Sequence, residues 1–257
     1  MKQLIKNGTP RPLVKFLVKL GNFYGSSTMM KNAFPSQKGA FNVLRGLGWK
    51  PRLCIDVGAY HGQWATMFRS VFPESRVLMV EGQSEKESIL KSKTVEDPLR
   101  LEYEIALLGA TEGQQVTFVE METGSSVFEE SSPYPRKRKT VKLKTLDNVL
   151  RRHPDFEDAN ALKLDTQGYE LEVMKGAGKL LKKVEVILLE VSLIQINKGA
   201  PLVAEVIAFL TERKFKLFDF CSQIRRKDGV LWQTDLLFIR DGVVPSLSNE
   251  LTDKNWG

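Results

Sequence analysis

The 257-residue sequence contains few of the residues that mark disulfide, metal or membrane proteins. Its two cysteines, Cys54 and Cys221, lie far apart without a C-x-x-C spacing, so neither a disulfide framework nor a cysteine zinc site is indicated. Only two histidines occur. The longest apolar run in the later part of the chain, 184–196, contains acidic residues and is too short to span a bilayer. These absences favour a protein of the reducing cytoplasm.

Acidic residues are missing from the first fifty positions. Residues 1–50 carry nine Lys or Arg and no Asp or Glu, whereas the remaining chain carries 29 basic and 31 acidic residues. Lysines interrupt the apolar stretch 13–20, and no small-residue cleavage site follows closely, which argues against a secretory signal. This stretch predicts an amphipathic basic helix. It either packs on the rest of the protein or makes peripheral contact with an anionic membrane through residues 1–20.

The composition is that of an ordinary globular protein, with 42% hydrophobic and 27% charged residues. From residue 53 onward, short β-rich runs alternate with helical stretches, which predicts an α/β domain with a mostly parallel sheet. We expect strands at 52–57, 76–80, 100–107, 161–165, 184–191, 215–220 and 236–240, and helices at 63–72, 85–93, 170–175 and 201–213. The predicted organisation is a basic helical segment at 1–50, a main domain at 51–245 and a tail at 246–257.

An insertion near 112–145 breaks the alternation of strands and helices. It predicts a hairpin with arms at 116–120 and 140–143, joined by a Gly-, Ser- and Pro-rich stretch. Insertions of this size often carry substrate contacts.

A glycine-containing turn follows the first predicted strand, in the run Cys54-Ile55-Asp56-Val57-Gly58-Ala59-Tyr60-His61-Gly62. Glycine lets the backbone approach a ligand, and the helix that begins next offers N–H groups to an anion. A dinucleotide site would need a second glycine in place of Tyr60, because a pyrophosphate comes very close to the chain. Tyr60 therefore argues against an NAD-dependent oxidoreductase. A cofactor with a single carboxylate, such as S-adenosylmethionine, tolerates it; a tight turn without a ligand is the alternative.

Two acidic residues stand at the ends of later strands. Glu81 follows the strand 76–80, about twenty residues after the turn, where a carboxylate can accept hydrogen bonds from both hydroxyls of a ribose. Asp165 ends the strand 161–165, and ligands of open α/β sheets bind outside such strand ends. Glu170 and Glu172 fall in the first turn of the next predicted helix, where carboxylates also satisfy unpaired N–H groups.

Taken together, these segments resemble the FkbM-type methyltransferases. The resemblance rests on Asp-Val-Gly-Ala-x-x-Gly at 56–62, Glu81, Lys-x-Asp-x-Gln-Gly-x-Glu at 163–170 and the strand 187–191, in that order. It implies a Rossmann-like class I methyltransferase, an α/β fold with a seven-stranded, mostly parallel sheet and helices on both faces. It further implies S-adenosylmethionine as cofactor and a hydroxyl of a glycan, glycolipid or small natural product as acceptor.

The resemblance also implies roles for individual residues. It assigns the methionine part of the cofactor to Asp56, Gly58, Ala59, Tyr60 and Gly62, the ribose to Glu81, and the adenine to Ile105 and Ala106, with Asp165 also bordering the cofactor. Tyr60 stands where the family commonly has asparagine, so this contact departs from the family pattern.

Methyl transfer from a sulfonium requires alignment and removal of the acceptor proton. Asp165 is the first candidate base, Glu190 the second and His61 the third. His153 lies in a charged stretch, 151–155, that suggests exposure. Asp165 and Glu190 could instead hold a divalent metal, which we do not favour because no ligand cluster with diagnostic spacing accompanies them.

The expected partner is a small-molecule or glycan acceptor. A nucleic-acid methyltransferase is a weaker alternative, because no Asn-Pro-Pro-Tyr-like motif for an extruded base occurs. A non-catalytic nucleoside-binding protein on the same fold is the other alternative. The basic runs 136–139 and 225–227 either contact anionic groups or form solvated loops. The sequence predicts a cytoplasmic protein and does not indicate its oligomeric state.

Overall fold

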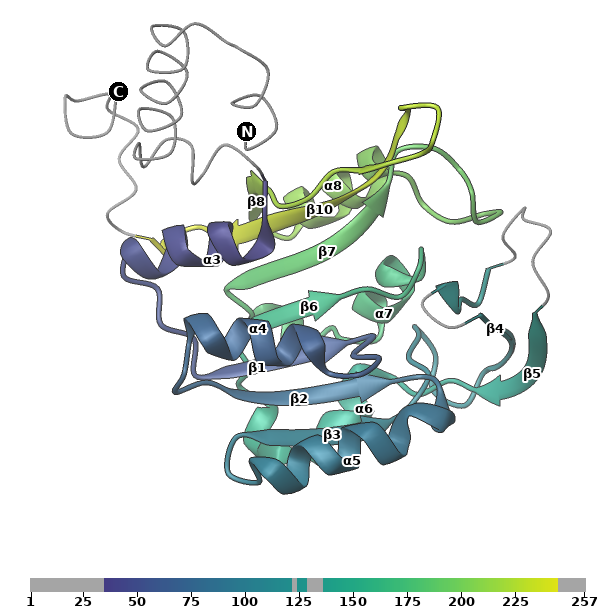
Figure 1. The fold of residues 1–257 in the computed structure, drawn as a ribbon, viewed down its shortest axis with the longest axis horizontal. Helices are drawn as coiled ribbons and strands as arrows, with labels where there is room; N and C mark the ends of the chain where they lie inside the picture. The colour runs from purple at the N-terminus through teal and green to yellow at the C-terminus, as the bar shows by residue number, and fades with distance from the viewer. Residues whose placement is uncertain (1–34, 122–123, 129–135, 245–257) are drawn as a thin grey trace, which may run out of the picture.

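The computed structural model describes residues 35–121, 124–128 and 136–244, and its centre is a twisted sheet (Figure 1). Its strands follow the order β3-β2-β1-β6-β7-β10-β8, and the short β9 pairs with β10. The first five in this order run parallel to one another, whereas β10 is antiparallel to both β7 and β8. The strands are β1 (Leu53–Val57), β2 (Arg76–Glu81), β3 (Leu101–Ile105), β6 (Ala161–Leu164), β7 (Val186–Ser192), β8 (Phe215–Phe220), β9 (Ile224–Arg225) and β10 (Leu231–Arg240). The predicted seven-stranded, mostly parallel sheet is confirmed.

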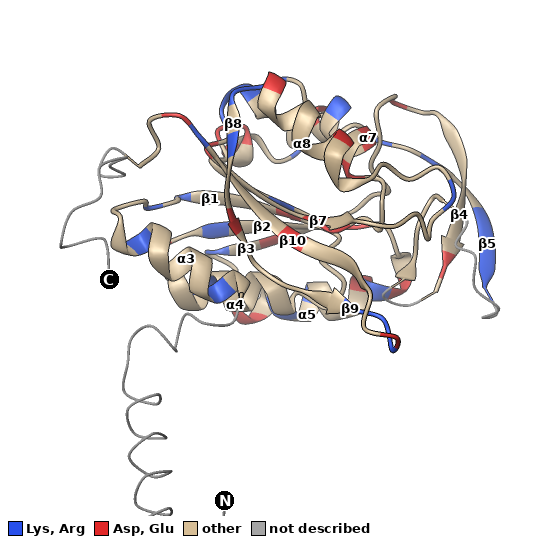
Figure 2. Ribbon diagram, turned by 90° about the horizontal axis from the view of Figure 1, so that it is seen from above, with Lys and Arg blue, Asp and Glu red and all other residues tan. Residues whose placement is uncertain are grey.

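Helices cover both faces of the sheet, as Figure 2 shows from above. One face carries α3 (Gln37–Gly46), α4 (Gln63–Val71) and α5 (Glu87–Glu96), and the other carries α6 (Leu146–Leu150), α7 (Glu170–Lys175) and α8 (Val203–Glu212). Short 3-10 turns occupy 84–86, 154–156 and 180–182. Successive strand residues point to opposite faces, so Leu78 enters one core and Met79 the other. Burial on both sides explains why these strands appear in the sequence as continuous apolar runs.

The predicted hairpin is present as a separate two-stranded sheet of β4 (Gln115–Glu120) and β5 (Lys137–Lys142). Phe118 of β4 is 3% exposed and opposes Lys139 of β5, whose amine lies 5.7 Å from the Phe118 ring centre. The hairpin lies beside the end of the main sheet (Figure 1). The amphipathic helix predicted at 13–20 and the tail at 246–257 lie outside the described residues.

Helix α3 belongs to the predicted basic segment, yet it packs firmly on the main domain. Ser36 caps its N-terminus by accepting a hydrogen bond from Gly39 N. Phe41, 2% exposed, makes edge-on ring contacts with Trp64, Phe68 and Phe72 from the α4 region. Burying a Phe side chain of this kind contributes roughly 1.5–3 kcal/mol. This packing holds Gln37, the first residue of α3, near the carboxyl ends of the parallel strands.

Candidate active site

A cavity of about 300 Å³ lies at the carboxyl ends of the parallel strands. This is the position, beside the point where the strand order reverses between β1 and β6, at which open α/β sheets bind ligands. Its lining follows the sheet from β3 to β10, through Ala106 after β3, Glu81 of β2, Gly58 after β1, Asp165 after β6, Glu190 of β7 and Asp235 of β10. Of the residues predicted for the site, those lining the cavity are Gly58, Ala59, Tyr60, Glu81, Ala106, Asp165 and Glu190; Asp56, His61, Gly62 and Ile105 are not among its lining residues.

The turn after β1 is held closely against β6. Gly58 has a φ of 73°, and a Cβ added there would lie 1.9 Å from the carbonyl oxygen of Asp165. Glycine is therefore required by the packing of two backbone segments, a different reason from the ligand approach that the sequence suggested. Gly62 has a φ of 70° and begins α4. Both glycines thus shape the turn, and only Gly58 borders the cavity.

Tyr60 adopts a φ of 50°, a left-handed conformation that is uncommon for residues other than glycine. Its ring stacks on His61 with the ring centres 3.8 Å apart, and the amine of Lys86 lies 4.4 Å from the Tyr60 ring centre. Tyr60 borders the cavity while His61 does not. The structure therefore does not place His61 beside the two predicted carboxylates as a base.

Glu81 is a fixed hydrogen-bond acceptor at the end of β2. Its side chain accepts backbone hydrogen bonds from Tyr60 N at 2.7 Å and Gln83 N at 2.8 Å. Burial raises the pKa of Glu81, and these two hydrogen bonds oppose that rise. The carboxylate oxygens keep acceptor capacity for further donors.

The part of the cavity around Glu81 fits the nucleoside of S-adenosylmethionine. Glu81 offers a carboxylate for a ribose diol, and apolar side chains that could flank a flat base lie nearby, at Ala106, Leu107, Leu108 and Phe118. Ile105, the last residue of β3, precedes this group without lining the cavity. The turn 58–60 would hold the methionine part. We call these regions the cofactor half of the cavity.

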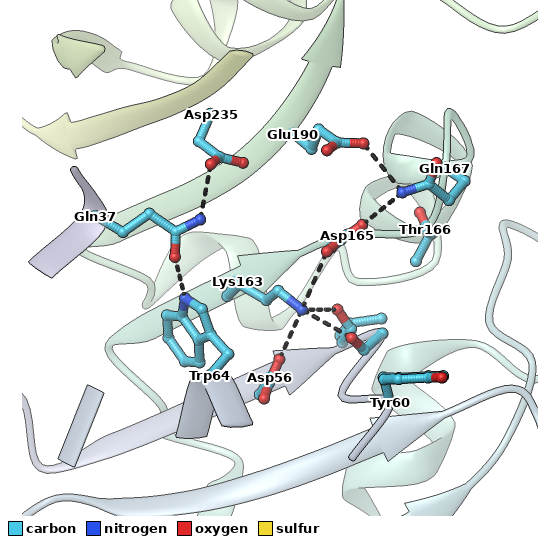
Figure 3. A network of polar contacts seen from close by, with 12 residues as sticks. Gln37, Asp56, Tyr60, Trp64, Lys163, Asp165, Thr166, Gln167, Glu190 and Asp235 are labelled. Atoms are coloured by element: carbon cyan, nitrogen blue, oxygen red, sulfur yellow. Dashed lines mark hydrogen bonds and ion pairs between the residues drawn. The ribbon is translucent and has the colours of Figure 1, made fainter. Parts of the chain in front are cut away.

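Beneath the turn lies a buried ion pair that sequence reasoning did not assign (Figure 3). The Lys163 amine is 3.0 Å from Asp56 Oδ1 and donates hydrogen bonds to the carbonyls of Gly58, at 2.8 Å, and Val57, at 3.2 Å. Burial lowers the pKa of Lys163, but Asp56 and Asp165 outweigh it and the net shift is upward, so the amine is charged.

Asp56 is fully buried, and burial raises its pKa while Lys163 opposes the rise. Sequence reasoning assigned Asp56 to the methionine part of the cofactor. In the structure it supports the turn through Lys163 instead of bordering the cavity. A lysine in the middle of a strand whose four residues are all buried was the signal that could have revealed this role.

Three carboxyl groups gather beyond the turn, one just after β6 and the others on β7 and β10. The Gln167 side-chain nitrogen donates to Asp165 Oδ1 at 3.0 Å and to Glu190 Oε1 at 3.1 Å, as Figure 3 shows. Gln233 also donates to Glu190, at 2.7 Å. Burial, followed by the negative charges of Asp165 and other nearby carboxylates, raises the pKa of Glu190 to about 9. Glu190 is thus protonated at neutral pH and suited to donate a hydrogen bond rather than to act as a base.

Of the two carboxylates among the predicted bases, Asp165 is the more open. Its side chain is 41% exposed, and Oδ2 lies 3.8 Å from the Lys163 amine. Glu170, by contrast, is buried and accepts hydrogen bonds from Thr166 N and Gly168 N, so it holds the turn that precedes α7 rather than the N–H groups of the helix itself. Burial raises the pKa of Glu170 to about 7. Asp165 is consequently the carboxylate best placed to receive a proton.

The remaining sequence candidates lie elsewhere. The His153 side chain is only 13% exposed and sits between Glu102, at 2.9 Å, and Glu104, at 3.3 Å, so the expected exposure was wrong. Among the residues that the structure describes, no group of three or more His, Cys, Asp or Glu is arranged to hold a metal ion. Within the same ranges, no helix is long and apolar enough to cross a membrane.

Comparisons with known proteins give one family match and several distant structural likenesses. A family model described as the methyltransferase FkbM domain matches residues 56–217. No curated protein matches the chain. Among solved structures, an FkbM methyltransferase from Methylobacillus flagellatus KT is similar over 74% of this chain and 43% of its own, with 14% identity and a TM-score of 0.45. The chain thus spans less than half of that protein.

Two further structures are similar at the same distant level. A SAM-dependent methyltransferase from Aquifex aeolicus shares 14% identity over 78% of this chain and 88% of its own, with a TM-score of 0.41. A precorrin-6y C5,15-methyltransferase from Geobacter metallireducens GS-15 shares 9% identity over 81% and 94%, with a TM-score of 0.45.

Proposed function

The chain belongs to the FkbM methyltransferase family, and from that premise we propose that it transfers a methyl group from S-adenosylmethionine to a hydroxyl of a glycan, a glycolipid or a small natural product. The observation that supports the proposal is the position of Asp165. Its partly exposed carboxylate stands between the cofactor half of the cavity and the carboxyl groups of Glu190 and Asp235. An acceptor entering beside Glu190 would bring its hydroxyl next to Asp165.

S-adenosylmethionine, when bound, supplies a methyl group on a positively charged sulfur that needs no further activation. The protein has to align the acceptor and remove its proton. A hydroxyl is a weak acid, so a carboxylate oxygen of Asp165 would take its proton while the acceptor oxygen receives the methyl group and the cofactor leaves as a neutral thioether. Lys163 holds the turn, and Gln167 fixes the orientation of the base through its hydrogen bond to Oδ1.

The test compares Asp165→Asn with Asp241→Asn, a control carboxylate just after β10 that pairs with Lys216 on the surface. Calorimetry measures S-adenosylmethionine binding, and transfer of a labelled methyl group to a panel of hydroxylated glycosides, glycolipids and natural products measures turnover. Asp165→Asn should keep its affinity and lose about 10²- to 10⁴-fold in turnover, while Asp241→Asn should match the wild type. Loss of affinity in Asp165→Asn would place this residue in cofactor binding instead.

The same assays separate the alternatives. Binding of S-adenosylmethionine without transfer to any hydroxylated compound would favour a non-catalytic nucleoside-binding protein. Transfer to RNA or DNA would replace the proposed acceptor class, and turnover that EDTA abolishes and a divalent ion restores would favour metal-assisted catalysis. We further propose a cytoplasmic location, with the membrane contact of residues 1–20 as a separate question.

A further inference from the structure

The cavity continues past Asp165 into a second half that the family model does not fully cover. Gln37, the first residue of α3, and Asp235, in β10, both border it and both lie outside residues 56–217. Neighbouring strands lie about 4.8 Å apart, so β10 is about 14 Å from β1 across the sheet. We call the region bordered by Gln37, Trp64, Glu190 and Asp235 the acceptor half. Its name rests on the proposed function.

A chain of three side chains builds the wall of the acceptor half (Figure 3). The Trp64 indole N–H donates to Gln37 Oε1 at 2.8 Å, and Gln37 Nε2 donates to Asp235 Oδ2 at 2.7 Å. An indole nitrogen can only donate, so the Gln37 amide has one orientation, with its carbonyl towards Trp64 and its N–H groups towards Asp235. The amide therefore fixes the Asp235 carboxylate at the cavity wall.

Carboxyl groups dominate the lining of this half. Asp165, Glu190 and Asp235 all border the cavity, and Asp235 and Glu190 are directly paired across β10 and β7. Burial raises the pKa of Asp235, as it does for Glu190, so these surroundings already disfavour negative charge.

The lining offers little positive charge in return. Lys163 is the single Lys or Arg among the described lining residues. Its amine already contacts Asp56 and the carbonyls of Val57 and Gly58. An entering anion would therefore lose water without gaining an uncommitted cation.

We propose that Gln37 and Asp235 select the acceptor by charge, admitting hydroxyl and amino groups and excluding a carboxylate or phosphate close to the reacting atom. A neutral or cationic donor finds carboxyl oxygens to bind, whereas an anion meets like charge. One such repulsion at about 5 Å, with an effective dielectric constant of about 20, corresponds to about 250-fold in affinity, and screening in the open part of the cavity reduces this to about 10-fold or more.

The test uses two sets of three compounds that differ in one group. One set is benzyl alcohol, benzylamine and benzoate; the other is the methyl glycosides of a hexose, its amino sugar and its uronic acid. Saturation-transfer NMR and competition measure their affinities for protein saturated with S-adenosylhomocysteine. The alcohol and amine of each set should bind at least about 10-fold more tightly than the carboxylate. Equal or tighter binding of the carboxylates would overturn the proposal, as would binding of none of the six compounds.

Variants of the wall residues test whether Gln37 and Asp235 cause this selectivity. Asp235→Asn should narrow the difference between alcohol and carboxylate to about threefold, and Gln37→Met should weaken alcohol binding by about threefold or more because Asp235 loses its donor. Asp241→Asn is the control and should keep the wild-type difference. A difference that survives in Asp235→Asn would overturn the proposal.

Measuring S-adenosylmethionine binding distinguishes a failure of this inference from a failure of the proposed function. Every variant should bind S-adenosylmethionine as the wild type does, since the wall lies outside the cofactor half. If the protein binds S-adenosylmethionine normally but does not distinguish acceptors by charge, only the proposal about Gln37 and Asp235 is rejected. A wild-type protein that does not bind S-adenosylmethionine would reject the proposed function and this inference with it.

Discussion

Glu190 makes protein stability depend on pH in a direction opposite to that of most carboxylates. Its pKa of about 9 in the folded protein lies far above the ordinary value of 4.5. Between these values the folded state binds a proton that the unfolded state has released, so the free energy of unfolding falls as pH rises. Glu190→Gln keeps the shape and the neutral charge of the protonated side chain and removes this titration.

The size of the effect follows from the shift. A carboxyl group that is protonated in the folded state and ionised in the unfolded state changes the free energy of unfolding by about 1.4 kcal/mol per pH unit. The largest possible change between pH 6 and pH 8 is therefore about 2.7 kcal/mol. Glu190 is partly exposed and its pKa also depends on the charge of Asp165, so we expect about 1 kcal/mol over this interval. Glu190→Gln should therefore gain on the wild type as pH rises, and the gain should level off above pH 9.

Urea denaturation at pH 6, 7, 8 and 9, at one ionic strength, measures this difference. Glu172→Gln is the control, because Glu172 lies on α7 paired with the exposed Lys175 and should leave the pH slope unchanged. Parallel pH profiles for the wild type and Glu190→Gln would refute the reasoning. Glu190 would then be ionised at neutral pH and would stand level with Asp165 as a candidate base.

The remaining predictions concern the cofactor turn, the ribose and the N-terminal segment. Glu81→Ala should weaken S-adenosylmethionine binding by about 10- to 100-fold in calorimetry, and unchanged affinity would remove its ribose role. Gly58→Val should lower the melting temperature as well as abolish binding, because its Cβ would meet the Asp165 carbonyl; normal thermal unfolding would contradict the described packing. Deleting residues 1–20 should abolish any salt-sensitive co-sedimentation with anionic vesicles, and absence of binding by the full chain would exclude the membrane interpretation.

The regular elements could be predicted from the sequence because their residues carry the pattern locally. The predicted strand 215–220 and helix 170–175 agree with β8 and α7 to the residue. Strand β10 begins at Leu231, five residues before its predicted start at 236. The missed part contains Gln233 and Asp235, polar side chains that contact Glu190 and Gln37. These polar residues interrupt the apolar pattern by which a buried strand is recognised, so the sequence did not indicate this part of β10.

The cofactor half of the site could be predicted better than the acceptor half. Gly58, Tyr60 and Glu81 lie in short motifs whose spacing reflects one turn and one neighbouring strand. Gln37 and Asp235, in contrast, are 198 residues apart in the sequence and come together only through the pairing of the strands between them. The start of α3 was also hard to recognise, because the helix is short and carries no acidic residue in its first turn. Local sequence patterns cannot specify such long-range contacts, so the hydrogen bond between Gln37 and Asp235 could be identified only from the structure.

The place of β10 also sets an order in which the site can form. The strand comes last in the described chain, yet it lies between β7 and β8, and among the described residues β8 joins the sheet only through β10. Gln37 and Asp235 close a loop of 198 residues, and contacts of such sequence separation form slowly. During synthesis or refolding, we therefore expect the cofactor half to assemble first, and the enzyme to become selective for its acceptor only when β10 pairs with β7.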